Sequence, residues 1–141
     1  MKIVFIGYQY PYGNKSFGKS LDVEIFVDSL SEANNRNVDS FYLDEYLDKE
    51  KNKSLNDDIK KYCSNINPKL IVFNLINNEL DKTILSYLKK QYKTLNWFGD
   101  DQWRYDLFTK EMAKYFTYQV TTDKFSVQKY LNDGYPNVIL S

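Results

Sequence analysis

The stretch Leu70-Ile71-Val72-Phe73 is apolar at every position and shows no alternation between apolar and polar residues. A strand with one face in water alternates, whereas a strand of a parallel sheet is covered by helices on both faces and is apolar throughout. Pro68 precedes this run and marks the end of the helical pattern before it. The stretch therefore predicts an interior strand of a parallel α/β sheet.

Further short apolar runs alternate along the chain with longer amphipathic stretches. This alternation is typical of βα units joined by right-handed crossovers. We expect a Rossmann-like α/β fold, a three-layer α/β/α sandwich around a mostly parallel sheet of five to six strands, with the strand order 3-2-1-4-5-6. The strand candidates are residues 2–6, 38–43, 70–75, 94–98, 118–122 and 137–140.

The stretches between these runs carry apolar stripes at intervals of three and four residues, which predict helices. One helix is expected over residues 21–34, and Ser54 with Asp57 has the spacing of a capping pair at the start of another. The expected core stripes are Leu55, Ile59, Tyr62, Cys63 and Ile66; Leu80, Ile84, Leu85 and Leu88; Trp103, Leu107, Phe108, Met112 and Tyr115; and Phe125, Tyr130 and Leu131.

The composition excludes several classes of function. A chain of 141 residues predicts a single domain over residues 1–141, and its 19 basic and 19 acidic residues cancel, so nothing favours nucleic acid as a partner. The absence of histidine excludes Ser-His-Asp triads and histidine-based zinc sites. The lone Cys63 fits a reducing compartment, and no apolar run is long enough for a transmembrane segment. We expect a cytoplasmic protein.

The segment Asn96-Trp97-Phe98-Gly99-Asp100-Asp101-Gln102-Trp103-Arg104 predicts a ligand site. An apolar run ends there at a glycine, and two adjacent carboxylates, a tryptophan and an arginine follow. Open α/β sheets bind ligands at the carboxyl ends of their strands, and adjacent acids rarely serve packing because each must be solvated or paired. In the expected strand order, the loop of residues 7–20 would meet this segment in the crevice between strands one and four.

Asp100 and Asp101 are the candidate catalytic carboxylates, and the sequence does not decide between them. Repulsion between two adjacent ionised acids would raise the pKa of one, which suits a general base, while capping of the next helix is the structural alternative for either acid. Arg104 could pair with one of the acids or bind substrate. Trp103 fits the core stripe and is also a candidate sugar platform. Asp123 precedes a helix, so it either caps that helix or lines the same edge of the sheet.

The loop Gly13-Asn14-Lys15-Ser16-Phe17-Gly18-Lys19-Ser20 matches the phosphate-loop pattern G-x-x-x-x-G-K-[ST]. A phosphate loop follows its strand directly, whereas here residues 8–12, including Pro11, intervene. The loop is therefore a nucleotide site, a ligand site built from backbone N–H groups, or a flexible polar connection. Gly7, Tyr8, Gly13 and Gly18, all in the longer loop of residues 7–20, are candidate substrate-binding residues.

Three blocks in the last third of the chain resemble the first domain of CgeB-like glycosyltransferases, enzymes with the two-Rossmann-domain GT-B architecture. The blocks are the segment of residues 96–104, Tyr118-Gln119-Val120-Thr121-Thr122-Asp123 and Gly134-Tyr135-Pro136-Asn137-Val138-Ile139-Leu140-Ser141. The resemblance implies a transferase that moves a sugar from a nucleotide-sugar donor to a carbohydrate or glycosylated acceptor. It further implies that this domain shapes the acceptor side and needs neither a metal nor a cofactor of its own.

The resemblance also implies a C-terminal donor-binding domain, which these 141 residues do not include, so we expect the chain to be inactive by itself. Two alternatives stay open. One is a nucleotide-binding protein that uses the phosphate-loop pattern. The other is a non-catalytic, flavodoxin-like interaction module in which the two acids only cap a helix.

Overall fold

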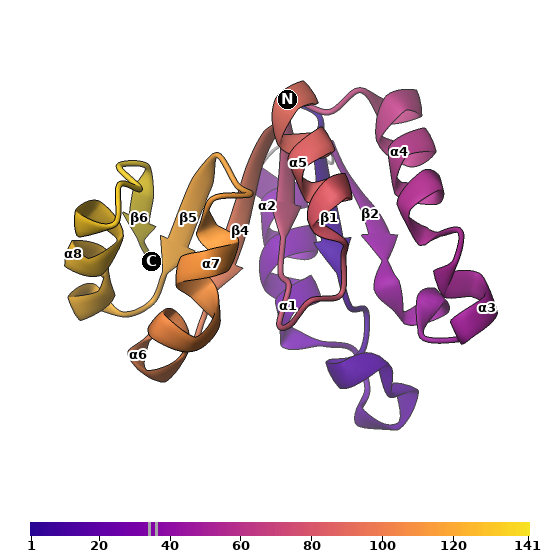
Figure 1. Ribbon diagram of the computed structural model, residues 1–141. Helices are drawn as coiled ribbons and strands as arrows, with labels where there is room; N and C mark the ends of the chain where they lie inside the picture. Colours follow the sequence, from indigo (N-terminus) through magenta and orange to yellow (C-terminus); the bar gives the residue numbers. More distant parts are fainter. Residues whose placement is uncertain (34, 36) are drawn as a thin grey trace. The chain divides into compact units, whose positions relative to one another are not determined.

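The computed structural model describes residues 1–33, 35 and 37–141 of the chain (Figure 1). The chain forms two compact units, Met1–Asn74 and Leu75–Ser141, each of which is described by itself. Within the described ranges, no helix combines the length and the apolar character that crossing a bilayer requires.

The first unit contains strands β1 (Ile3–Gly7), β2 (Val38–Tyr42) and β3 (Leu70–Phe73). Its helical segments are the 3₁₀ turns η1 (Pro11–Gly13), η2 (Lys15–Phe17) and η4 (Leu43–Tyr46), the π-helical segment η3 (Glu24–Ser29), and the α-helices α1 (Leu21–Val23), α2 (Leu30–Ala33), α3 (Lys49–Asn52) and α4 (Leu55–Ile66). The helix expected over residues 21–34 is thus present as α1, η3 and α2, and position 34 lies outside the described residues.

Strand β1 is the central strand of the first unit. It pairs in parallel with β2 on one side and with β3 on the other, which is the order β2-β1-β3. The predicted order 3-2-1 is therefore wrong. All of β1 is buried, whereas Asp39 in β2 is exposed. A strand with an exposed acid in its middle fits an outer position better than a position covered on both faces.

Helix α4 covers β2 with the face that the sequence predicts. Leu55, Ile59 and Cys63 are buried, and burial raises the pKa of the Cys63 thiol to about 12, which fits a packing role. Tyr62 donates its hydroxyl hydrogen to the carbonyl oxygen of Ser40 in β2 at 2.8 Å, and its ring contacts that of Phe41 edge-on.

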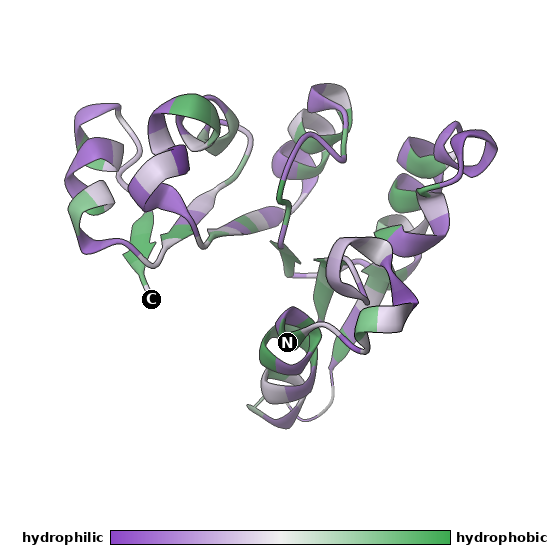
Figure 2. Cartoon of the chain, turned by 90° about the horizontal axis from the view of Figure 1, so that it is seen from below, coloured by the Kyte–Doolittle hydropathy of each residue, from purple (hydrophilic) through white to green (hydrophobic). Residues whose placement is uncertain are grey.

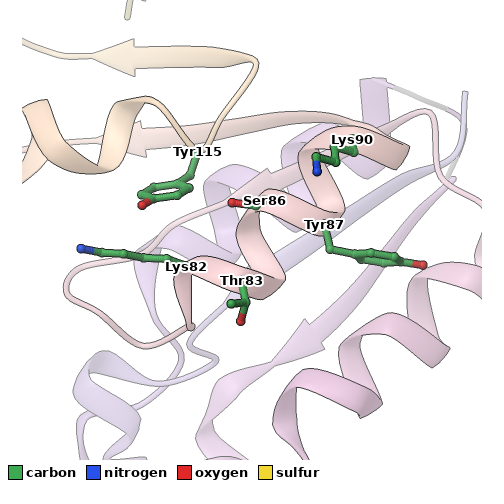
Figure 3. A pocket seen from close by; sticks show the side chains of 6 residues that line it. All are labelled: Lys82, Thr83, Ser86, Tyr87, Lys90 and Tyr115. Carbon is green, nitrogen blue, oxygen red and sulfur yellow. The ribbon is translucent and has the colours of Figure 1, made fainter.

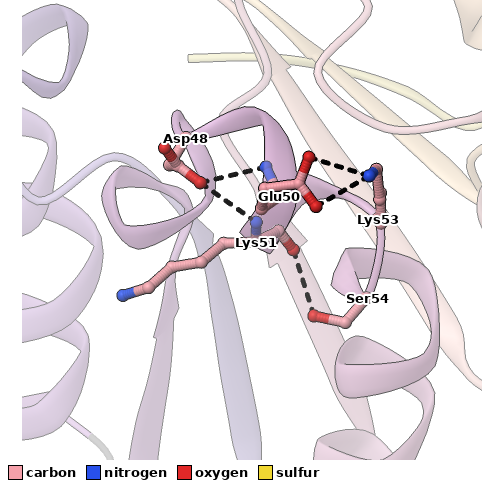
Figure 4. Close-up of polar contacts among 5 residues, drawn as sticks. All are labelled: Asp48, Glu50, Lys51, Lys53 and Ser54. Carbon is pink, nitrogen blue, oxygen red and sulfur yellow. Dashed lines mark hydrogen bonds and ion pairs between the residues drawn. The ribbon is translucent and has the colours of Figure 1, made fainter.

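The observed side-chain cap lies at the start of α3, one helix before the predicted cap of α4 (Figure 4). Asp48 has extended backbone angles, and its carboxylate accepts from the backbone N–H groups of Glu50 and Lys51 at the start of α3. Ser54 has helical angles and donates its hydroxyl to the carbonyl oxygen of Lys51. The predicted capping pair of Ser54 with Asp57 is therefore wrong, because an N-cap side chain needs an extended backbone to reach the helix N–H groups.

The second unit contains strands β4 (Lys93–Phe98), β5 (Tyr118–Thr121) and β6 (Val138–Leu140), which pair in parallel in that order. Its helical segments are α5 (Lys82–Gln91), α6 (Asp101–Arg104), the π-helical η5 (Tyr105–Thr109), α7 (Lys110–Ala113) and α8 (Lys124–Asn132). Together with the first unit, these parallel strands and packed helices confirm the Rossmann-like α/β class, and all six predicted strands overlap observed ones.

The continuous helical segment α6–η5–α7 buries only part of the predicted stripe: Met112 is buried as predicted, and Phe108 and Tyr115 are half-buried. Trp103 and Leu107 are 64% and 82% exposed, while Tyr105, Met112 and Phe116 are buried. The π-helical turn η5 closes i→i+5 hydrogen bonds and so holds one residue more than an α-helical turn. Trp103 lies before this turn, so its exposure belongs to the first turn of α6, in which Asp101 and not Trp103 is buried.

Two elements at the end of the chain leave apolar side chains in contact with solvent. Phe125 and Leu131 of α8 are exposed, contrary to prediction, whereas Tyr130 is fully buried. Figure 2 shows β6 in the colour of hydrophobic residues, and Ile139 and Leu140 in this strand are about half exposed. In the described residues of the second unit, β6 pairs with β5 alone.

We predict that the end of α4 depends on the left-handed backbone of Asn67. Its φ is 52°, and its N–H donates to the carbonyl oxygen of Cys63 at 2.8 Å. Most side chains lose about 1–2 kcal/mol in this conformation, asparagine loses less, and glycine loses little. Asn67→Ala should lower the free energy of unfolding in urea by about 1 kcal/mol. Asn67→Gly is the control, and an equal loss in both variants would contradict this account.

Candidate functional site

At the carboxyl end of β4, one of the two adjacent acids is exposed and the other is buried. Asp100 is exposed, and its carboxylate makes no hydrogen bond or ion pair with another described residue. Its carbonyl oxygen accepts from the N–H groups of Trp103 and Arg104, so only its backbone starts the helix. Asp100 is therefore a solvent-facing carboxylate, and its side chain does not act as the cap that the sequence also allowed.

Asp101 is fully buried in the second unit. Its Oδ2 accepts a hydrogen bond from the Tyr130 hydroxyl at 2.7 Å, and its Oδ1 has no partner among the described residues. Burial and the neighbouring carboxylate both raise the pKa of Tyr130, so this tyrosine stays a neutral donor. Of the two candidate catalytic carboxylates, only Asp100 reaches the surface, and the catalytic role of either stays a prediction.

Arg104 connects the helix to the loop before α5. Its guanidinium donates to the carbonyl oxygen of Ile76 and lies 4.4 Å from the ring centroid of Phe108. The Glu79 carboxylate accepts from the N–H groups of Ile76 and Asn77, which tightens the same loop. Arg104 forms no ion pair with Asp100 or Asp101, so its observed role is to hold the loop of residues 76–79 against the helix.

Trp103 lies on the solvent side of this helix, in its first turn. The N–H of Trp103 donates to the carbonyl oxygen of Asp100 at 3.2 Å, so the two residues share the first turn. The Arg104 guanidinium lies 5.5 Å from the Trp103 ring centroid. An exposed aromatic ring and an exposed carboxylate in one helical turn are a combination that can bind a polyhydroxylated ligand.

The carboxyl end of β5 lies beside that of β4. The Thr122 hydroxyl donates to the carbonyl oxygen of Gly99 at 2.7 Å, which joins the two strand ends. Asp123 caps α8: it accepts from the N–H of Phe125, and the Ser126 hydroxyl donates to it at 2.6 Å, which holds the pKa of Asp123 below its usual value. Of the two roles predicted for Asp123, capping is the one observed.

In the first unit, the loop after β1 is held by Asp44, which sequence reasoning missed. Its carboxylate accepts from the N–H groups of Gln9 at 2.6 Å and Tyr10 at 3.1 Å. Gly13 has a φ of 71° and lies against Leu47, where a Cβ atom would come within 2.1 Å of a methyl carbon. Asp44 follows β2, and an acid at a strand end was the signal that could have found it.

Gly7 and Tyr8 lie at the carboxyl end of β1, next to the end of β3. The N–H of Asn74 donates to the carbonyl oxygen of Ile6 at 3.1 Å, and Tyr8 is half-buried. A Cβ atom on Gly7 would lie 2.7 Å from the Phe5 ring, so the position requires glycine or a shifted ring. With the order β2-β1-β3, the topological switch point lies between β1 and β3, and not between strands one and four as predicted.

The phosphate-loop pattern does not form a phosphate cradle. Gly18 is exposed with a φ of 76°, and the Lys19 ammonium is 2.5 Å from the Asp28 carboxylate. Backbone N–H groups that a phosphate would need already donate to oxygens of the same unit: those of Gly13, Asn14, Ser16, Phe17, Gly18 and Ser20. The loop forms two 3₁₀ turns in place of an open nest of N–H groups.

The predicted site residues are therefore distributed over both units. Asp100, Trp103, Arg104 and Asp123 lie at the carboxyl ends of β4 and β5, while Gly7, Tyr8, Gly13 and Gly18 belong to the first unit. The meeting of the loop of residues 7–20 with the segment of residues 99–104 stays a prediction. A scan of the chain against protein-family models finds no match, and a search of the curated proteins also finds none.

We predict that Tyr130→Phe destabilises the second unit because it leaves the buried Asp101 carboxylate without its hydrogen-bond donor. The expected loss of unfolding free energy is about 1–3 kcal/mol. Tyr135→Phe is a matched control: the Tyr135 hydroxyl donates to the carbonyl oxygen of Lys110 at 3.0 Å near the surface. Urea unfolding should show a clearly smaller loss for Tyr135→Phe. Equal losses would mean that Asp101 does not depend on Tyr130.

We also predict that magnesium ATP does not bind to the loop of residues 13–20, because six of its backbone N–H groups already donate to oxygens of the same unit. Calorimetric titration should give no saturable heat with either the natural chain or Lys19→Ala. Saturable binding that disappears in Lys19→Ala would contradict this prediction and would favour a nucleotide-binding protein.

Proposed function

We propose that this chain is the acceptor-side domain of a glycosyltransferase that moves a sugar from a nucleotide-sugar donor to a carbohydrate or glycosylated acceptor. The observation that carries the proposal is that the first helical turn after β4 carries both the exposed Asp100 carboxylate and the exposed Trp103 ring. The resemblance of the three sequence blocks to CgeB-like glycosyltransferases supports it.

Asp100 would act as the general base. Its carboxylate takes the proton of the acceptor hydroxyl while that oxygen attacks the anomeric carbon of the donor, and the bond from this carbon to the nucleotide phosphate breaks. Such a base must reach the acceptor oxygen within hydrogen-bond distance, which suits an exposed side chain. Asp101 is a positioning residue in this proposal, because its buried contact with Tyr130 orients the turn that carries Asp100.

Trp103 would provide the surface on which an acceptor sugar ring stacks. Aromatic rings bind the apolar faces of sugars by burying their C–H groups, and the polar groups nearby then select the hydroxyls. In the proposal Arg104 holds the adjacent loop of residues 76–79 against the helix, and Asp123 caps the start of α8. The donor nucleotide is bound by a separate C-terminal domain, and the reaction takes place in the cytoplasm.

Turnover tests the general base. In a protein that joins this chain to its donor-binding domain, Asp100→Asn should lower kcat by roughly 10²–10⁴-fold, as measured by release of the nucleotide. Asp106→Asn is the matched control, since Asp106 is an exposed acid on the same helical segment that pairs with Lys129 at 3.3 Å. Natural turnover in Asp100→Asn would remove this residue from the mechanism.

The same assay tests the stacking platform. Trp103→Ala should raise KM for the acceptor by about tenfold, which corresponds to about 1.4 kcal/mol, with little change in kcat. Leu107→Ala serves as the control because Leu107 is even more exposed on the neighbouring turn. If both variants raised KM equally, the surface would bind by general apolar contact and not by stacking on one ring.

A further inference from the structure

The second unit has a surface pocket of about 410 Å³ that involves none of the residues proposed for sugar transfer (Figure 3). It is lined by Lys82, Thr83, Ser86, Tyr87, Lys90 and Tyr115. All except Tyr115 belong to α5, and Tyr115 follows α7. The lining combines ammonium groups, hydroxyl groups and aromatic rings, and it contains no carboxylate.

One row of α5 faces Tyr115. Lys82, Ser86 and Lys90 are four residues apart, so they lie above one another on the helix surface. Figure 3 shows the Lys82 side chain and the Ser86 hydroxyl on the side of α5 where Tyr115 lies, whereas the Tyr87 ring points to the other side. Two cations with a hydroxyl between them and an aromatic ring opposite therefore form the floor and one wall of the pocket.

The electrostatics of this row favour an anion. Lys90 is exposed and forms no ion pair with another described residue. Lys82 donates a hydrogen bond to the Glu111 carboxylate, which raises the pKa of Lys82, so its ammonium stays charged. Lys114 adds a third cation, 5.1 Å from the Tyr115 ring centroid. Glu111 is the carboxylate that competes with an anion for Lys82.

We infer that this pocket binds a phosphate group carried on a sugar. The phosphate lies between the ammonium groups of Lys82 and Lys90 and accepts from the Ser86 hydroxyl, and the sugar ring packs against Tyr115. The inference goes beyond the proposed glycosyl transfer and does not depend on it, because it uses other residues and is tested by binding alone. A free sugar phosphate and a lipid with a phosphorylated inositol headgroup both present a phosphate on a ring that carries hydroxyl groups.

Chemical-shift titration of the ¹⁵N-labelled protein tests the inference, with glucose 6-phosphate as the probe and glucose as its uncharged counterpart. Glucose 6-phosphate should shift the amides of residues 82–90 and 115 saturably and more weakly at high salt, while glucose should not. Lys90→Gln and Lys82→Gln should weaken binding by up to about fivefold, the range of exposed charge pairs. Glu111→Gln should tighten binding by a similar factor because it releases Lys82.

Lys124→Gln is the control, since Lys124 is an exposed lysine of the same unit outside the pocket. It should bind like the natural chain. Sedimentation with vesicles that contain phosphatidylinositol 4-phosphate separates the two sources: binding to these vesicles without binding of glucose 6-phosphate assigns the phosphate to a lipid. No saturable binding of either probe, unchanged affinity in Lys90→Gln, or weaker binding in Glu111→Gln would each overturn the inference.

Discussion

The hydrogen bond from Tyr130 to the buried Asp101 carboxylate sets the orientation of the helical segment after β4. A carboxylate in an apolar interior needs a donor, and Tyr130 on α8 supplies it. Successive residues of an α-helix are about 100° apart, so a first turn that points Asp101 inward points Trp103 outward. The exposure of the proposed acceptor surface is thus a consequence of a contact on the opposite side of the same turn.

The class of the fold could be predicted from the sequence, but the order of its strands could not be read from crossovers alone. Unbroken apolar runs identify buried parallel strands, and the strand candidates overlap the observed ones. A right-handed crossover leaves open on which side of β1 the next strand lies. The informative signal was the polar pair Asp39 and Ser40 in β2, because such residues indicate a strand that is not covered on both faces.

The sequence also placed the candidate site at the correct end of β4, but it did not predict which acid faces solvent or which groups Arg104 contacts. The glycine and the acids after an apolar run correctly indicate the carboxyl end of β4. Asp101 is held inward by Tyr130, which lies 29 positions after it in the chain. Arg104 donates to the carbonyl oxygen of Ile76, which lies 28 positions before it. Such distant partners leave no local trace in the sequence, and the same holds for Thr122 and Gly99.

The π-helical turn η5 also constrains how this protein can vary in length. It holds one residue more than a regular turn, and the buried Met112 and Ala113 of α7 follow it directly. A deletion of a single residue between Tyr105 and Thr109 would restore regular α-helical winding and rotate the following turns by about 100°. Homologues should therefore tolerate substitutions in η5 far better than insertions or deletions, and chain length in this turn becomes a marker of shared ancestry.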